Sequence, residues 1–368
     1  MAGKFFSGSM IILLVTALAL VSLGACAAPA ATAQTAPGGE GAAEAGGSGP
    51  GGAGSEPAAD AGLPLEGDDG LPAEGEIIDI QLLIGDDFDI VALADTPPTA
   101  TTLMPVASGK TVFSNDATTI DASNTADGYV MIKFNKPETA KLKVIVECPS
   151  KVNYTYNLSG GGNYEVFPLS DGSGAYKISV YKNVSGTKYS TVYSASASVA
   201  LKNEFAPFLL PNQYVNYNAS SKAVALAKEL VKDTKDELEA VAAVYDYVVK
   251  NITYYKERAA NVQSGYLPNI DTVLAEKKGI CFDYAALMTA MLRSQGIPCK
   301  LVIGYAGTVY HAWINVYTKE EGWVDSVIYF DGVEWKRMDP TFASSGGSSE
   351  SAMQYIGDGK NYSAKYLY

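Results

Sequence analysis

The chain has 368 residues, enough for two ordinary domains, and its 27 Lys and Arg against 40 Asp and Glu give a formal net charge of −13. An acidic chain without a Lys/Arg cluster is poorly suited to phosphate backbones, so we expect no nucleic-acid partner. A single histidine and the absence of a CxxC pair argue against a transition-metal site. We therefore expect no bound metal and no other cofactor.

The first 26 residues have the features of an export signal. Lys4 precedes an apolar run from Met10 to Leu20 that is too short to span a bilayer with margin, and the segment ends in "LGAC" at Cys26. It resembles the bacterial lipoprotein signal, in which small residues precede a cysteine that is lipidated after cleavage. The alternative is an ordinary secretory signal with an incidental cysteine. The resemblance implies a lipid anchor on Cys26, which would hold the protein at the extracellular face of a bacterial cell membrane.

Residues 27–75 come next and consist mostly of Ala, Gly, Pro, Ser, Glu and Asp, without an aromatic residue. Such a segment buries too little apolar surface to offset its chain entropy, so we expect a disordered tether. A flexible chain of this length has a root-mean-square reach of about 40 Å. That reach would hold a folded domain clear of a membrane surface.

Residues 76–205 have the pattern of several short strands. In "KLKVIVEC", every second residue from Leu142 to Val146 is apolar, which is typical of a half-buried strand. Residues 175–201 are rich in Tyr, Val, Ser and Thr and predict two strands that turn near Gly186. We expect an all-β domain, an immunoglobulin- or fibronectin-like sandwich, that serves as a spacer or an adhesion module.

Residues 206–368 change from helical to strand patterns. A helix is predicted in "SSKAVALAKELVKD", and Thr234 with Glu237 predicts a capping box that opens the helix "ELEAVAAVYDYVVKN". A short helix, "IDTVLAEKK", and a longer one beginning near Cys281 follow. Beyond Pro298 we predict four successive antiparallel strands: "KLVIGYAG", "VYHAWINVYT", "GWVDSVIYF" and "VEWKRMDPT". This order of elements predicts an α+β domain.

Cys281 occupies the first turn of the predicted helix "FDYAALMTAMLRSQ". Gly279 would let the backbone turn sharply before the helix, and Gly296 with Pro298 would end it. Unpaired N–H groups and the positive end of the helix dipole favour a thiolate at such a position. The alternative is that Cys281 is a small buried hydrophobic residue.

A nucleophilic thiol needs a base, and the base needs an acceptor that orients it. His311 lies thirty residues after Cys281 (311 − 281), in a predicted strand, and Asp339 lies twenty-eight residues further (339 − 311). Antiparallel strands would bring His311 and Asp339 together against the start of the Cys281 helix. The alternatives are that His311 is a hydrogen-bonded strand residue and that Asp339, before Pro340, starts a turn.

The C-terminal part resembles the transglutaminase-like superfamily of papain-fold enzymes. The resemblance covers about residues 223–343 and rests on "YDYVVKNITYY", "GICFDYAALMTAMLRSQGIPCKLVIGY", "HAWINV" followed by "GWV", and "WKRMDPT". It implies a catalytic set of Cys281, His311 and Asp339. It also implies an oxyanion hole formed by the Cys281 N–H and an upstream aromatic residue, for which Tyr266 is the candidate and Tyr254 and Tyr255 are rivals.

The resemblance implies a cysteine-dependent enzyme that acts on amide or peptide bonds through a thioester. Hydrolysis by water and transfer to an amine both stay open, and so do peptidase, cross-linking transferase and amidase activities. Peptide or protein substrates are expected, among them cell-envelope peptides. The alternative is a catalytically silent surface lipoprotein whose β-sandwich is the binding module. We expect the remaining cysteines, Cys148 and Cys299, to be free.

Overall fold

The computed structural model describes residues 77–78, 102–319, 322–325, 328–330, 335–337 and 361–368. All of these residues belong to one compact unit, Ala43–Tyr368. The predictions for the signal (1–26), the tether (27–75) and Asp339 lie outside the described residues. Within them, no helix is both long enough and apolar enough to cross a membrane.

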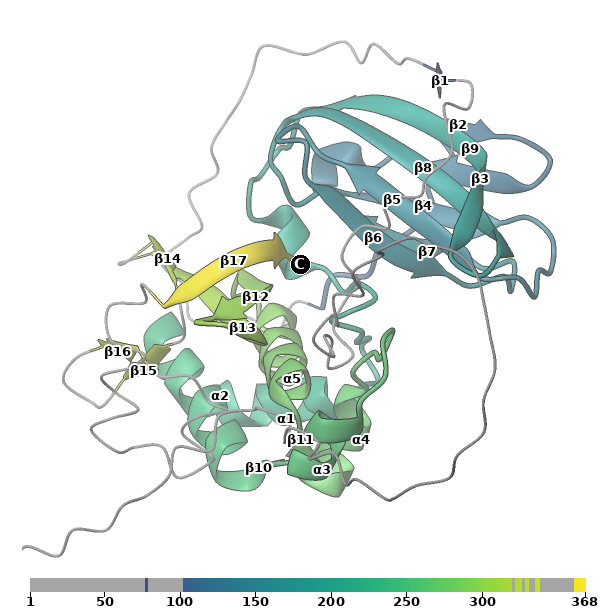
Figure 1. Cartoon of the computed structure of the whole chain (residues 1–368). Coiled ribbons are helices and arrows are strands. Elements are labelled where there is room, and N and C mark those ends of the chain that lie inside the picture. The colour runs from purple at the N-terminus through teal and green to yellow at the C-terminus, as the bar shows by residue number, and fades with distance from the viewer. Residues whose placement is uncertain (1–76, 79–101, 320–321, 326–327, 331–334, 338–360) are drawn as a thin grey trace, which may run out of the picture. The chain divides into compact units, whose positions relative to one another are not determined.

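The first part of the described chain is built from strands in two sheets (Figure 1). One sheet has the order β1-β9-β8-β5-β6 and the other has the order β2-β3-β4-β7. All pairings are antiparallel except that of β1 with β9. The strands are β1 (Ile77–Ile78), β2 (Val112–Ser114), β3 (Thr118–Asp121), β4 (Tyr129–Phe134), β5 (Leu142–Glu147), β6 (Asn153–Leu158), β7 (Glu165–Pro168), β8 (Gly174–Ser185) and β9 (Lys188–Val199).

The two sheets contribute buried residues to one hydrophobic cluster. Ile132 of β4 belongs to it together with Val144 of β5 and Val180 of β8. The predicted strand around Leu142–Val146 is confirmed by β5, but its outer face is not solvated. There Lys143 is buried, with its ammonium 4.6 Å from the centre of the Tyr189 ring. A cation over an aromatic face explains why a lysine is tolerated at this position.

A connector with the short 3-10 helix η2 (Ala206–Leu209) leads into the helices. These are α1 (Lys222–Val231), α2 (Glu237–Asn251), α3 (Lys256–Asn261), α4 (Ile270–Glu276) and α5 (Cys281–Ser294). The predicted capping box is wrong. Asp236 caps α2, and its side chain accepts the Glu239 N–H at 2.8 Å, whereas the Thr234 hydroxyl donates to the Val231 carbonyl at 2.7 Å. The helix therefore starts at Glu237 with a different capping residue.

Helix α5 forms the centre of this part of the chain, and all of its residues are buried. It contacts α1, α2 and α4 and also packs on strands β12 (Cys299–Ala306) and β13 (Val309–Thr318) (Figure 1). The helix ends where it was predicted to end, because Gly296 adopts a φ of 81° beyond the last turn. A helix surrounded on all sides can hold a residue at its first turn in a fixed place.

The sheet beside α5 has the order β14-β13-β12-β17, in which all three pairings are antiparallel. The prediction of four successive strands is therefore wrong in its second half. The segment "GWVDSVIYF" is divided between β14 (Gly322–Val324) and β15 (Ile328–Phe330), and β15 pairs with β16 (Trp335–Arg337) in a separate two-stranded sheet. The fourth strand of the sheet is β17 (Tyr362–Leu367), which sequence patterns missed.

Candidate active site

Cys281 is the first residue of α5. The preceding residue, Ile280, caps the helix with an extended backbone (φ −94°, ψ 176°). Gly279 is required for space, because a Cβ there would lie 2.6 Å from the Cβ of Asp283. Its backbone is outside the left-handed region, so the expected sharp turn is not the reason for the glycine. The close approach of Gly279 to Asp283 fixes how the chain enters the helix.

Three donors surround the Asp283 carboxylate in the first turn of α5. The Ile280 N–H donates to Oδ2 at 2.8 Å, the Tyr266 hydroxyl donates to Oδ1 at 2.6 Å, and an Arg258 guanidinium nitrogen lies 3.4 Å from Oδ2. The Arg258 guanidinium also donates to the Tyr266 hydroxyl at 3.0 Å and lies 3.5 Å from Glu276. Because every partner donates to it, Asp283 is bound here as an anion.

Burial and hydrogen bonding both affect the pKa values of the three side chains in this cluster. Burial raises the pKa of the Asp283 carboxyl above its ordinary value, although the Tyr266 hydroxyl, the Ile280 N–H and Arg258 oppose the rise. Burial, with the hydrogen bond to Asp283, also raises the pKa of Tyr266, so its phenol keeps its proton at neutral pH. Burial opposes the charge of Arg258, but Tyr266 and Asp283 raise the pKa of its guanidinium overall.

The three tyrosines considered for the oxyanion hole have different surroundings. Tyr266 is half-buried, and its one hydroxyl proton is directed at Asp283. Tyr255 precedes α3; its N–H donates to the Gly279 carbonyl at 2.8 Å, and its ring lies 4.2 Å from the Lys278 ammonium. Tyr254 lies in the short strand β10 (Thr253–Tyr254). An oxyanion role for any of them stays a prediction.

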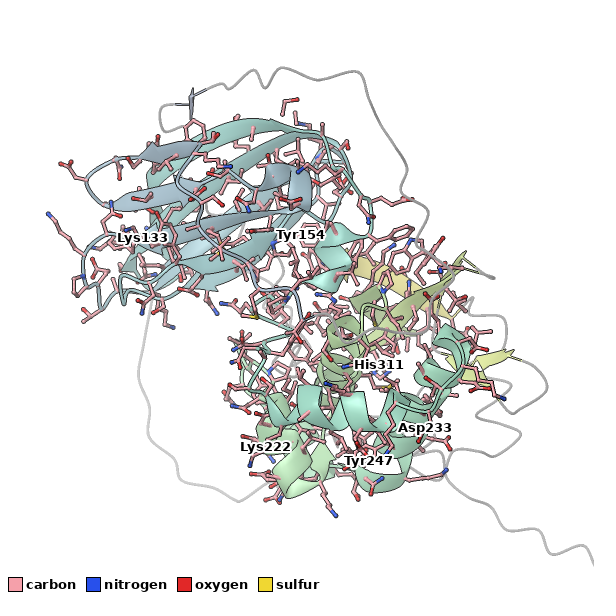
Figure 2. All side chains as sticks on the ribbon, turned by 180° about the vertical axis from the view of Figure 1, so that it is seen from behind. Lys133, Tyr154, Lys222, Asp233, Tyr247 and His311 are labelled. Atoms are coloured by element: carbon pink, nitrogen blue, oxygen red, sulfur yellow. The ribbon has the colours of Figure 1, made fainter. Side chains whose placement is uncertain are left out.

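His311 lies near the start of β13, the strand that packs on α5. Its side chain is buried, within the dense group of side chains around α5 and β13 that Figure 2 shows. The imidazole lies nearly parallel to the Trp313 ring, with 6.3 Å between the ring centres and 23° between the planes. Tyr362 of β17 is the same distance away, 6.3 Å. The Trp313 and Tyr362 rings also contact each other, with 5.2 Å between their centres, so the two form one aromatic group beside the imidazole.

Gly304 lies opposite His311 in the β12–β13 pairing. A Cβ at this position would lie 2.0 Å from the Ser363 carbonyl oxygen and 2.8 Å from the Trp313 ring. The absence of a side chain lets β17 and the Trp313 ring approach β12 beside the histidine. The glycine therefore shapes the surroundings of His311.

Two of the predicted site residues lie outside the described part of the chain. Asp339 follows the last residue of β16, Arg337, by two positions in the sequence, and Cys26 lies in the segment before the first strand. The three cysteines that the structure describes, Cys148, Cys281 and Cys299, are free, which confirms the expectation for Cys148 and Cys299. Among the described residues, no group of three or more His, Cys, Asp or Glu side chains could hold a metal ion.

The sequence pattern of the transglutaminase-like superfamily matches residues 224–326. These residues are a transglutaminase-like domain. The match confirms the resemblance found in the sequence, and it includes Cys281 and His311. It ends before Asp339, so the third member of the predicted set lies beyond the matched residues.

Two relatives are similar to about half of this chain. The uncharacterised protein YebA of Bacillus subtilis is 27% identical over 187 residues, which are 45% of this chain and 25% of that protein. A protein of Methanocaldococcus jannaschii is 27% identical over 210 residues, which are 51% of this chain and 56% of that protein. The chain therefore spans about a quarter of the first relative and about half of the second.

Solved structures with partial similarity have low overall agreement. A proposed protease from Parabacteroides distasonis has 22% identity and a TM-score of 0.24, covering 29% of this chain and 24% of its own. A proposed cysteine protease from Cytophaga hutchinsonii has 17% identity and a TM-score of 0.30, covering 63% and 68%. A red sea bream transglutaminase has 13% identity and a TM-score of 0.26, covering 62% and 53%.

Sequence reasoning about the transglutaminase-like domain missed Arg258. The residue lies on α3, a helix of six residues without a buried side chain, so no apolar periodicity marks this helix in the sequence. No helical or strand repeat in the sequence links Arg258 to Cys281. The signal that was available is the rarity of arginine, which occurs three times in the chain, at positions 258, 293 and 337.

Proposed function

We propose that the transglutaminase-like domain is a cysteine-dependent enzyme that acts on amide bonds, with Cys281 as nucleophile, His311 as base and Asp339 as the acceptor that orients the imidazole. The observation that carries the proposal is the position of Cys281 as the first residue of a buried helix whose neighbouring strand bears His311. Backbone N–H groups at a helix start stabilise negative charge on a thiol. The only histidine of the chain is thus on an element in contact with that helix.

The connection between helix and sheet supports the pairing of Cys281 with His311. Near the end of α5, the Arg293 side chain donates to the Cys299 carbonyl at the start of β12, at 2.8 Å. From Arg293 back to Cys281 is 12 residues of helix (293 − 281), or about 18 Å. From Cys299 to Gly304, the partner of His311, is 5 residues of strand (304 − 299), or about 17 Å. Measured from the contact between Arg293 and Cys299, the helix and the strand thus extend over similar lengths. We therefore expect the Cys281 thiol and the His311 imidazole to lie at the same end of α5.

The reaction would proceed in two steps. The Cys281 sulfur forms a bond to the carbonyl carbon of the amide, the carbon–nitrogen bond breaks, and the amine leaves with the proton that His311 took from the thiol. Water or a second amine then gives a proton to His311 and attacks the thioester carbon. The carbon–sulfur bond breaks, and the Cys281 sulfur leaves with the proton that His311 holds. Water yields a carboxylic acid and an amine yields a new amide. Asp339 would hold the imidazole tautomer and stabilise its charged form.

The negative oxygen formed in both steps needs two donors. We assign the first to the Cys281 N–H, one of the unpaired donors of the first helical turn. Tyr266 is our candidate for the second donor, and this role requires its hydroxyl to turn from Asp283 toward the substrate. The present hydrogen bond of 2.6 Å to Asp283 means that such a turn would cost the carboxylate one of its donors.

We further propose that the enzyme works outside the cell while anchored to a bacterial membrane. Lipidation at Cys26 would supply the anchor, residues 27–75 the tether and an immunoglobulin- or fibronectin-like domain at 76–205 the spacer. The sequence "LGAC" before the acidic, Gly- and Ala-rich segment supports this arrangement. Cell-envelope peptides or proteins would then be the substrates within reach. Removal of the acylation site in a Cys26→Ala variant would release the protein from the membrane fraction of expressing cells.

The test of catalysis is a panel of peptide and amine substrates, assayed with the wild type, Cys281→Ala and Cys299→Ala. Cys299 is a matched control because it is a free, buried cysteine of the same domain. We expect a loss of at least about a thousandfold in kcat for Cys281→Ala, since a lost nucleophile removes the covalent step. Cys299→Ala is expected to keep its turnover. Unchanged turnover in Cys281→Ala would contradict the proposal and favour the alternative of a silent surface module.

A further inference from the structure

The start of α5 places two groups that can be negative next to each other. Cys281 would carry a thiolate during the proposed reaction, and Asp283, two residues later, is an anion with no exposed surface. A carboxylate at this position is useful because it accepts the Ile280 N–H and completes the helix cap. The same charge opposes a thiolate on the first turn. The cap therefore needs a compensating cation.

Arg258 supplies that cation. One of its nitrogens lies 3.4 Å from Asp283 and 3.0 Å from the Tyr266 hydroxyl, which in turn donates to Asp283. The Arg258 side chain is 23% exposed, whereas Asp283 is fully buried, so the guanidinium covers the carboxylate on its solvent side. Its second contact, with the more exposed Glu276, is longer, at 3.5 Å.

The backbone holds Arg258 in this place. The Tyr255 N–H, at the start of α3, donates to the Gly279 carbonyl at 2.8 Å, and strand β10 pairs in parallel with β11 (Lys278–Gly279). The short helix that bears Arg258 is thus attached to the two residues before Ile280. The Arg258 guanidinium also lies over the Tyr255 ring, 4.9 Å from its centre.

We propose that Arg258 is a positioning residue for the nucleophile: it neutralises Asp283, so that the carboxylate caps α5 without opposing negative charge on Cys281. The inference deepens the proposed function and rests on it for its biological meaning. Its test needs no substrate, because an alkylating reagent reports on the thiolate directly. In that reaction the Cys281 sulfur bonds to the CH₂ carbon of iodoacetamide and iodide leaves.

The experiment measures the rate at which iodoacetamide modifies Cys281 in the folded full chain at one pH, located by mass spectrometry. The variants are Arg258→Met, Arg258→Lys and the double variant Arg258→Met/Asp283→Asn. The control is Lys232→Met, which removes one cation from an exposed ion pair with Glu229 on another helix. We expect Arg258→Met to slow labelling by about tenfold, because an uncompensated carboxylate then opposes the thiolate, while Lys232→Met leaves the rate unchanged.

Removal of both charges decides whether Arg258 acts through Asp283. The double variant and Arg258→Lys are expected to label within about threefold of the wild type, since one has no buried carboxylate to compensate and the other keeps the cation. A purely structural role would leave the double variant as slow as Arg258→Met, and that result overturns the inference. If Arg258→Met does not fold, the labelling rate of Asp283→Asn is compared with that of the double variant. A tenfold difference in labelling rate between those two variants overturns the inference.

The result of the labelling experiment can be distinguished from the result of the substrate assay that tests the proposed function. A protein that turns over no amide substrate, yet shows slow labelling in Arg258→Met and recovery in the double variant, loses the proposed function and keeps this inference. Turnover that depends on Cys281, combined with wild-type labelling in Arg258→Met, overturns this inference alone.

Discussion

The sulfur of Cys281 has surroundings unlike those of the other two described cysteines. Cys281 keeps 7% of its surface exposed, whereas Cys148 and Cys299 keep 2% and 0%. Burial, with the nearby Asp171 and Glu147, raises the pKa of the Cys148 thiol well above its ordinary value. Burial raises the pKa of the Cys299 thiol to about 11, although the Thr289 hydroxyl opposes the rise. Both of these thiols are therefore inert packing residues near neutral pH.

We expect iodoacetamide at pH 8 to modify Cys281 at least about tenfold faster than Cys148 or Cys299. Cys281 lies at a helix start with some exposure, whereas the other two are protonated and covered. Peptide mapping by mass spectrometry over time measures the three rates separately. In urea all three should react at similar rates, which controls for intrinsic differences. Equal and slow labelling of the three in the folded protein would favour a silent domain.

The Asp283 carboxyl makes the free energy of unfolding depend on pH, and its raised pKa determines the direction of that dependence. Its pKa is raised in the folded protein, mainly by burial, so folding favours the protonated form. The contribution is therefore fully present below the ordinary carboxyl pKa of about 4 and is lost as the pH rises through the folded value. We expect the free energy of unfolding of the wild type, relative to Asp283→Asn, to fall over that window and then to level off. Urea unfolding of both proteins from pH 3.5 to 8 measures the difference, and a difference that grows with pH would contradict it.

Candidate site residues could be named from the sequence where their chemistry shows locally. The glycine, cysteine and helix pattern made Cys281 a candidate, and the rarity of histidine made His311 a candidate. Arg258 was not predictable, because its contact with Asp283 forms only when α3 folds back beside α5 across 25 residues of sequence. The role of Gly279 was misjudged for a similar reason, since the side chain it must avoid belongs to the following helix.

Among the elements, helices were easier to predict than the order of strands in the sheet. The apolar spacing of α2 identified the helix, but two candidate capping residues precede it, and only the structure selects Asp236 over Thr234. Strand β17 escaped prediction because its partner is β12, more than fifty residues earlier, and pairing between distant segments leaves no local signature. Its Leu367 N–H also donates to the Tyr154 hydroxyl at 3.2 Å, an even more distant contact.

The close packing of β12 and β17 makes Gly304 a sensitive position. We expect Gly304→Ala to destabilise the protein by about 1–3 kcal/mol, because the added methyl group meets the Ser363 carbonyl and the Trp313 ring, and one of them must move. Urea unfolding measures the loss. Gly161→Ala is the control, since Gly161 is exposed, and we expect a change within about 0.5 kcal/mol there. Equal stability of the two variants would mean that β17 does not lie against Gly304.

At the scale of the whole molecule, one buried cation joins segments that are far apart in the sequence. Arg293 is fully buried and donates to the carbonyls of Cys299, Leu210 and Tyr368, at 2.8, 2.5 and 2.6 Å. These carbonyls belong to β12, to the connector before the helices and to the residue after β17. Burial lowers the pKa of the Arg293 guanidinium, a sign that its charge is costly and that the carbonyls must compensate for it.

We expect Arg293→Met to reduce the free energy of unfolding by about 3 kcal/mol. The Leu210 and Cys299 carbonyls lose a charged donor inside the protein, whereas the Tyr368 carbonyl keeps the Leu301 N–H at 2.8 Å, so the loss is smaller than three hydrogen bonds would suggest. Relief from burying a charge offsets part of the cost. Urea unfolding measures the change against Lys228→Met, a matched loss of one exposed cation on α1 that should cost less than about 0.5 kcal/mol. If the two variants are equally stable, the three segments are held together by apolar packing, and Arg293 is not the group that joins them.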